Sequence, residues 1–284
     1  MSEKTIAERQ ITIRATPEKV FEAFSKPEHL VKWFCDGMDT EGGMFRFWGQ
    51  RLLNATTPEQ ARQKLMSVEE PRRIEIDWPY GGGQTRLGFE VVAHPDGSLA
   101  TIRHELLENT DDLKWWLAVD GILVALYNLR SYVESGVALL HFDLRKLGTT
   151  SYCDVTIQVP KDDVWAALTV PSEMNKWVSA EAKVDLREGG EYGYGWDEGG
   201  PGRILELEVG QKLVTSWSYD SEPETTAVWT VEGKGGQTTV TVTHSGFATP
   251  EQTEGYVQGW SAFLGALAAL LEGREQARKA GLED

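Results

Sequence analysis

The chain contains one segment twice. Residues 11–34 read ITIRATPEKVFEAFSKPEHLVKWF and residues 155–178 read VTIQVPKDDVWAALTVPSEMNKWV, an offset of 144 residues without a gap. Solenoid repeats have shorter periods of about 20–50 residues, whereas a domain typically has about 100–150. The 284 residues are therefore predicted to form two copies of one domain, at residues 1–143 and 150–284. Features that both copies share indicate architecture, and features that differ indicate where function has diverged.

Both copies have the same predicted order of elements. A strand at residues 11–13 or 155–157 is followed by two short helices, which a proline separates. Alternating apolar residues then predict several antiparallel strands, and each copy closes with a long helix whose apolar residues recur at spacings of three and four. This order predicts an α+β fold, in which a curved antiparallel sheet wraps around the long C-terminal helix and buries its apolar face.

A curved sheet and a helix leave a hollow between them wherever side chains do not fill it, and that hollow is the generic ligand site of this architecture. Aromatic residues at alternate strand positions share one face of the sheet. Tryptophan and tyrosine combine an apolar body with a polar tip, which suits an amphipathic ligand. An alternative is that the rings only fill the core. The residues predicted to line the cavities are Trp177, Tyr192, Tyr194, Trp196, Trp217, Trp229, His244 and Trp260 in the second copy, and Trp33, Phe45, Phe47, Trp78, Phe89 and His104 in the first.

Several motifs occur at fixed places in this order. They include the segment PEKVFEAFSKPEHLVKWF at residues 17–34, a Glu-Gly-Gly element before alternating aromatics, and VTHSGF at residues 242–247 with Gly259-Trp260 behind it. These motifs resemble the START-like superfamily, the helix-grip fold of the birch-pollen allergen and polyketide cyclases. Within it the chain looks most similar to the family of heat-shock protein 90 ATPase activator homologues. The first copy departs from the pattern, because it reads IRHELL at residues 102–107 and has Gly121-Ile122 in place of Gly-Trp.

Three hypotheses for function follow. The leading one is a non-enzymatic protein that binds a small hydrophobic or aromatic ligand, chiefly in the second copy, which is richer in tryptophan and tyrosine. The resemblance implies a second hypothesis, a protein-interaction module that regulates a chaperone. It also implies a third, an enzyme of the cyclase or aromatase type, with His244 or Glu188 as acid or base. A degenerate first copy that only stabilises the second by packing against it is a further hypothesis.

His104 and His244 end equivalent strands of the two copies. An imidazole beside a cavity can transfer protons near neutral pH. The same residue in both copies favours a structural role instead, as a buried histidine bonded to a neighbouring hydroxyl or backbone group. Glu41 and Glu188 also recur, each before two glycines, and a role in ordering the glycine turn is favoured over catalysis.

The composition limits the partners. With 28 Lys and Arg against 44 Asp and Glu, the net charge is −16, which disfavours nucleic acid and anionic membranes. The chain has no apolar run of about 18 residues that could span a membrane, and the first residues lack the apolar core of a signal peptide. Its histidines and cysteines show no metal-ligand spacing, so we expect no metal or other cofactor. Cys35 and Cys153 are not at equivalent positions, which predicts unpaired thiols and a cytoplasmic location.

Overall fold

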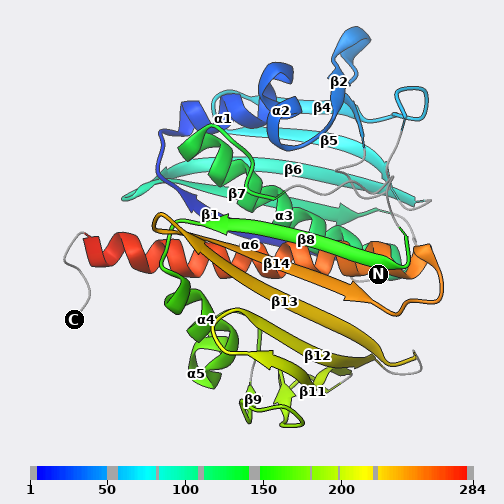
Figure 1. Ribbon diagram of the computed structural model, residues 1–284. Coiled ribbons are helices and arrows are strands. Elements are labelled where there is room, and N and C mark those ends of the chain that lie inside the picture. The colour runs from blue at the N-terminus through cyan, green and yellow to red at the C-terminus, as the bar shows by residue number, and fades with distance from the viewer. Residues whose placement is uncertain are drawn as a thin grey trace. The chain divides into compact units, whose positions relative to one another are not determined.

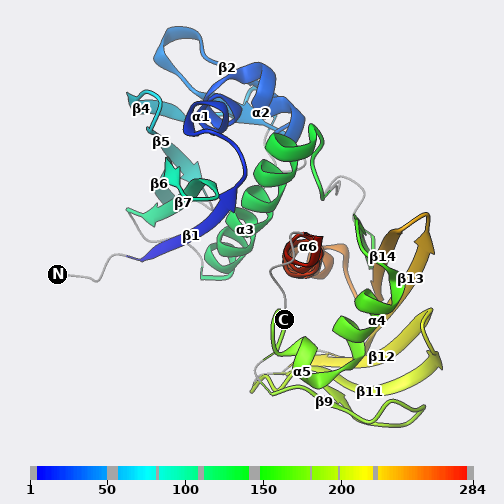
Figure 2. The same cartoon turned by 90° about the vertical axis from the view of Figure 1, so that its left-hand side faces the viewer.

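The computed structural model describes residues 5–49, 57–80, 83–107, 112–140, 148–179, 181–197, 199–219 and 223–279. The chain divides into two compact units, Met1–Arg145 and Lys146–Asp284. Each unit is an α+β domain in which an antiparallel sheet curves around a long helix (Figures 1 and 2). This is the predicted helix-grip fold in two tandem copies. Most of the segment between the two predicted domains, at residues 144–147, lies outside the described residues.

The first domain has a five-stranded sheet in the order β1-β7-β6-β5-β4 and a small β2-β3 ladder. The long helix α3 packs against β1 and β7, and the short helix α1 packs against β6. Its elements are β1 (Ile6–Ile13), α1 (Pro17–Ser25), α2 (Pro27–Trp33), β2 (Gly37–Asp39), the 3-10 turn η1 (Glu41–Gly43), β3 (Arg46–Trp48), β4 (Lys64–Glu69), β5 (Arg73–Tyr80), β6 (Gly83–His94), β7 (Gly97–Leu106) and α3 (Asp112–Ser135).

The second domain repeats this topology with the sheet order β11-β12-β13-β14-β8 and a small β10-β9 ladder. Figure 2 looks along α6 and shows the sheet curving around it. Its elements are β8 (Thr150–Ile157), α4 (Lys161–Thr169), α5 (Pro171–Met174), β9 (Lys183–Val184), β10 (Tyr192–Gly193), β11 (Gly199–Glu208), β12 (Lys212–Tyr219), β13 (Thr225–Lys234), β14 (Gln237–Ser245) and α6 (Pro250–Lys279).

The two short helices form where the sequence predicts them. The side chain of Thr16 accepts a hydrogen bond from the backbone N–H of Lys19 and caps α1, which begins at Pro17. In the second copy the helix after the proline is shorter than predicted. It ends at Met174, because the side chain of Asn175 bonds Ser179 and the N–H of Ala182 and fixes a turn there.

One tryptophan joins the two short helices in each domain. The indole N–H of Trp33 donates to the carbonyl oxygen of Ala23 at 2.9 Å, and that of Trp177 donates to Ala167 at the same distance. The bond links the end of one helix to the segment after the next proline. Since both copies contain it, the polar tips of these two tryptophans serve the architecture.

Candidate functional site

The rings predicted to line the second cavity form one connected network between the sheet and α6. At its centre, the ring centroid of Trp217 lies 5.0 Å from that of Trp260 and 5.3 Å from that of His244. Trp229 contacts Trp260 from the other side, at 5.2 Å. The remaining predicted rings, Trp177, Tyr192, Tyr194 and Trp196, join the network through edge-on contacts.

Sequence reasoning left three rings out of the site. Tyr256 and Phe263 stand on α6, and Phe247 follows β14, and all three contact the network. The signal was available for two of them, because positions 256, 260 and 263 are spaced four and three apart and share one face of a helix.

The predicted rings of the first domain also come together, with one exception. Phe34 connects Trp33, Phe47 and Phe89 at centroid distances of 5.2, 5.1 and 5.9 Å. Phe47 contacts Trp78, which stacks on His104 at 5.3 Å. The exception is Phe45, which lines a different cavity, near α1.

His244 is bonded at both ring nitrogens. The indole N–H of Trp260 donates to Nδ1 at 3.2 Å, so the ring proton is on Nε2, which lies 2.7 Å from the hydroxyl of Thr225. That hydroxyl donates in turn to the carbonyl oxygen of Trp217. Burial lowers the pKa of His244 to about 3. The imidazole is therefore neutral and held in one tautomer. These bonds indicate a structural role for His244.

His104 occupies the same position in the first domain. Its Nε2 lies 2.7 Å from the hydroxyl of Thr85, which donates to the carbonyl oxygen of Trp78. Burial lowers its pKa to about 4. Ile122 stands where the second domain has Trp260.

The lowered pKa of His244 predicts acid sensitivity. An unfolded histidine has a pKa near 6.5, so between about pH 3 and pH 6.5 the unfolded chain binds the additional proton. The stability from the neutral imidazole is complete above pH 6.5 and is lost as the pH falls, at about 1.4 kcal/mol per pH unit. We expect ring ¹⁵N shifts to show neutral, Nε2-protonated His244 in the folded protein at pH 5. A ring that titrates near pH 6.5 would contradict the buried bonding pattern.

One row of inward-facing residues differs between the two sheets in side-chain size and polarity, and we call it the central row. In the second domain Thr215, Ala227, His244 and Ser151 stand directly opposite one another on β12, β13, β14 and β8. The equivalent row of the first domain is Ile76, Leu87, His104 and Ala7. Two branched aliphatic side chains are thus replaced by a threonine and an alanine, and the row becomes smaller and more polar.

Five buried polar atoms of the second domain have no hydrogen-bond partner among the described residues; one is Oε1 of Gln258 on α6, and the other four lie in or beside the central row. Two of these four are the hydroxyls of Thr215 and Ser151 in the central row. The others are the indole N–H groups of Trp217 and Trp229, which flank that row in the register. A buried polar group without a partner costs about 1–3 kcal/mol. Such groups are expected where a bound molecule completes the hydrogen bonding.

The two cysteines, Cys35 and Cys153, are buried free thiols. The thiol of Cys153 donates to the carbonyl oxygen of Val257, and burial raises its pKa to about 12. Within the described part of the chain, no three His, Cys, Asp or Glu side chains are grouped as metal ligands. Among the described residues, no helix is both long and apolar enough to cross a membrane.

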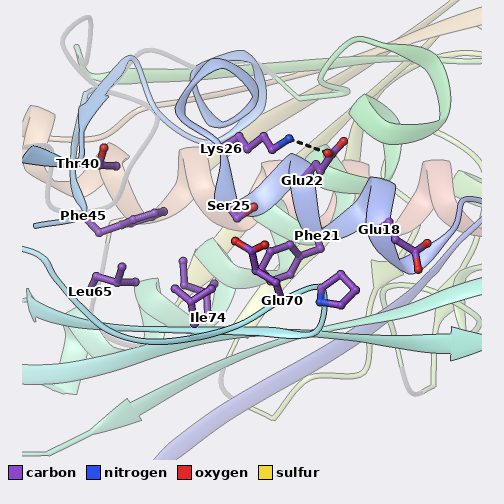
Figure 3. A pocket seen from close by; sticks show the side chains of 12 residues that line it. Glu18, Phe21, Glu22, Ser25, Lys26, Thr40, Phe45, Leu65, Glu70 and Ile74 are labelled. Carbon is purple, nitrogen blue, oxygen red and sulfur yellow. Dashed lines mark hydrogen bonds and ion pairs between the residues drawn. The ribbon is translucent and has the colours of Figure 1, made fainter. Parts of the chain in front are cut away.

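A cavity of about 410 Å³ lies in the first domain, at a place the sequence did not predict. It is bounded by α1 on one side and by β4 and β5 on the other, and the lining includes no residue of the described part of α3. Figure 3 shows Phe21 extending from α1 toward Ile74 across this space, with Leu65 and Phe45 beside them. The full lining is Glu18, Phe21, Glu22, Ser25, Lys26, Thr40, Phe45, Leu65, Val68, Glu70, Pro71 and Ile74.

Comparison with known families gives a match in each domain. A family model described as activator of Hsp90 ATPase homolog 1-like protein matches residues 14–134 and 158–272. These two segments together cover well over half of the chain. No curated protein matches it significantly.

Solved structures show similar folds. CalU16 from Micromonospora echinospora, determined by NMR, has 27% sequence identity over 44% of this chain and 66% of its own, with a TM-score of 0.40. DynU16, from the dynemicin biosynthetic locus, has 17% identity over 95% of this chain and 98% of its own, with a TM-score of 0.39. The Aha1 dimer from Colwellia psychrerythraea has 17% identity over 46% of this chain and 98% of its own, with a TM-score of 0.38.

Proposed function

The chain belongs to the family of activator of Hsp90 ATPase homolog 1-like proteins, and we propose that its second domain binds a small aromatic ligand that carries a hydrogen-bond acceptor. The observation that supports this most is the pair of buried indole N–H groups, on Trp217 and Trp229, that have no partner among the described residues. An indole N–H only donates, so its natural complement is an oxygen acceptor.

The aromatic network supplies the apolar contacts. Edge-on or offset contact between a ligand ring and an aromatic side chain contributes about 0.5–1.5 kcal/mol beyond burial. Burying about 200 Å² of apolar ligand surface contributes about 5 kcal/mol before the cost of association. These contributions require no chemical step, so they fit a binding protein.

The central row supports a place for the ligand beside Ala227 and Thr215. Ala227 has the smallest side chain in the row, and Thr215 beside it presents a buried hydroxyl that can donate or accept. In the first domain the same positions hold Leu87 and Ile76. The reduction in side-chain size, together with the unpartnered hydroxyl, favours the second domain as the binder.

The network reaches the surface beside Trp217. Trp196 and Phe263 are half-buried, and their ring centroids are 5.6 Å apart. Trp196 follows β10, and its indole lies over Gly200, where an added Cβ would approach the ring to 3.2 Å. We therefore propose this place as the entrance, with Trp196 as the side chain that moves.

Two ligands with the same naphthalene body test the proposal by calorimetry. We expect 2-acetylnaphthalene to bind more tightly than 2-ethylnaphthalene, which lacks the carbonyl oxygen. Trp217→Phe keeps an aromatic ring and removes the N–H. It should lower the affinity for 2-acetylnaphthalene about fivefold, which corresponds to the loss of one neutral hydrogen bond. The affinity for 2-ethylnaphthalene should stay the same.

The matched control is Trp78→Phe, the equivalent change in the first domain, which should alter neither affinity. Equal affinities of both ligands for the unaltered protein, or no saturable binding of either, would count against the proposed site.

A second candidate function is regulation of a chaperone, which the family match in both domains favours. It is tested by adding the protein to a purified heat-shock protein 90 homologue, where an unchanged ATPase rate would argue against it. The cyclase-type hypothesis has less support, because His244 is bonded at both nitrogens and Glu188 is exposed in the turn before Gly189.

A further inference from the structure

The cavity of the first domain has an apolar interior. Phe21, Phe45 and Ile74 are buried and Leu65 is half-buried, and these side chains come from α1, the segment before β3, and the strands β4 and β5. Its volume of about 410 Å³ falls within the range of about 300–1,000 Å³ that is usual for small-molecule sites.

Charged residues at the same cavity are mainly acidic. Glu18, Glu22 and Glu70 line it together with one cation, Lys26. Lys26 is already paired, because its Nζ lies 2.6 Å from a carboxylate oxygen of Glu22, as the dashed line in Figure 3 marks. The lining therefore keeps a net charge of −2, on Glu18 and Glu70.

The second copy lacks this arrangement. At the offset of 144 residues, Glu22 and Lys26 correspond to Ala166 and Val170, and Phe21 corresponds to Trp165. Glu18 keeps an acidic counterpart, Asp162, so at this offset the first domain differs in the Glu22–Lys26 pair and in Phe21.

From this arrangement we infer that the first domain binds an amphipathic monocation, with an apolar or aromatic body between α1 and the β4–β5 strands and an ammonium group beside Glu18 and Glu70. An ammonium group gains from the nearby carboxylates and also from the faces of Phe21 and Phe45. A neutral molecule of the same shape gains only from burial. An anion is repelled by the lining and by the chain charge of −16. This site is independent of the aromatic-ligand site proposed for the second domain.

Three ligands with one body and different head groups test the inference: 4-phenylbutylammonium, 4-phenylbutanol and 4-phenylbutyrate. We expect the ammonium to bind about tenfold more tightly than the alcohol at low salt, with the carboxylate weakest. Raising the salt concentration should lower the affinity for 4-phenylbutylammonium and leave the affinity for 4-phenylbutanol unchanged. Methyl NMR signals of Leu65 and Ile74 should shift on binding.

Substitutions at the cavity test whether its carboxylates cause the preference for the ammonium ligand. Val68 is 41% exposed, so Val68→Lys should leave the fold intact while lowering the ammonium affinity about tenfold and raising that of 4-phenylbutyrate. Glu70→Gln should lower only the ammonium affinity. The control Glu232→Gln removes an exposed carboxylate of the second domain and should change nothing.

The inference is overturned if all three ligands bind equally, if none binds saturably, or if Val68→Lys and Glu232→Gln have the same effect. None of these results would bear on 2-acetylnaphthalene binding, so the two proposals fail separately.

Discussion

Ala227→Leu is expected to abolish binding of 2-acetylnaphthalene by the second domain, with Kd rising at least about 100-fold, or about 3 kcal/mol. Ala227 stands in the central row between Thr215 and His244. A leucine there occupies the room that the proposed ligand needs, as Leu87 does in the first domain. Calorimetry with the variant measures the loss.

The same variant shows whether that room exists in the protein without ligand. If the interior is open at Ala227, the added side chain fills it and the free energy of unfolding stays the same or rises. If the interior is packed solid, overpacking lowers it by about 1–3 kcal/mol. Unimpaired binding of 2-acetylnaphthalene to a folded Ala227→Leu protein would place the ligand elsewhere. The smaller change Ala227→Val should give an intermediate loss of affinity.

His244→Ala is expected to lower the free energy of unfolding of the second domain by about 3–5 kcal/mol. The change leaves a cavity under Trp260, and it removes the partner of the Trp260 N–H and of the Thr225 hydroxyl. Trp260 is buried and its N–H is left unsatisfied, whereas the Thr225 hydroxyl still donates to the carbonyl oxygen of Trp217, so the cost of the cavity and the cost of one unsatisfied group add. Denaturant unfolding of the full chain, followed by a probe in each domain, measures the effect.

The control is His94→Ala, a change at a partly exposed histidine at the end of β6, which should alter stability by less than about 0.5 kcal/mol. If the His244→Ala protein is as stable as the His94→Ala control, the hydrogen bonds of the imidazole contribute little to the free energy of unfolding. A stable variant that no longer carries out a reaction would support the enzyme hypothesis instead.

The architecture could be predicted from the sequence because it is specified locally and twice. Thr16, Pro17 and the apolar spacing define the first helix, and the repeat at residues 155–178 gives an independent second example. The repetition of His104 and His244 also indicated a structural role, and the hydrogen bonds to Thr85 and Thr225 provide the physical reason.

The details of the candidate site could not be predicted, because they depend on strand register. The central row joins four residues from four strands, and only the pairing of β12, β13, β14 and β8 brings Thr215 and Ser151 into one line. A one-residue slip would move every one of these side chains to the other face. The first-domain cavity was missed for a related reason, since it joins α1 to strands about 50 residues later.

The indole N–H groups of Trp217 and Trp229, which have no partner among the described residues, are proposed to bind a ligand oxygen. The most direct measurement is the ¹H–¹⁵N spectrum of the tryptophan indoles while 2-acetylnaphthalene is added. The indole N–H signals of Trp217 and Trp229 should shift saturably, and those of Trp33 and Trp177, which already donate to backbone carbonyls, should stay in place. If 2-acetylnaphthalene binds saturably while the indole N–H signals of Trp217 and Trp229 do not shift, these two groups do not bind the ligand oxygen.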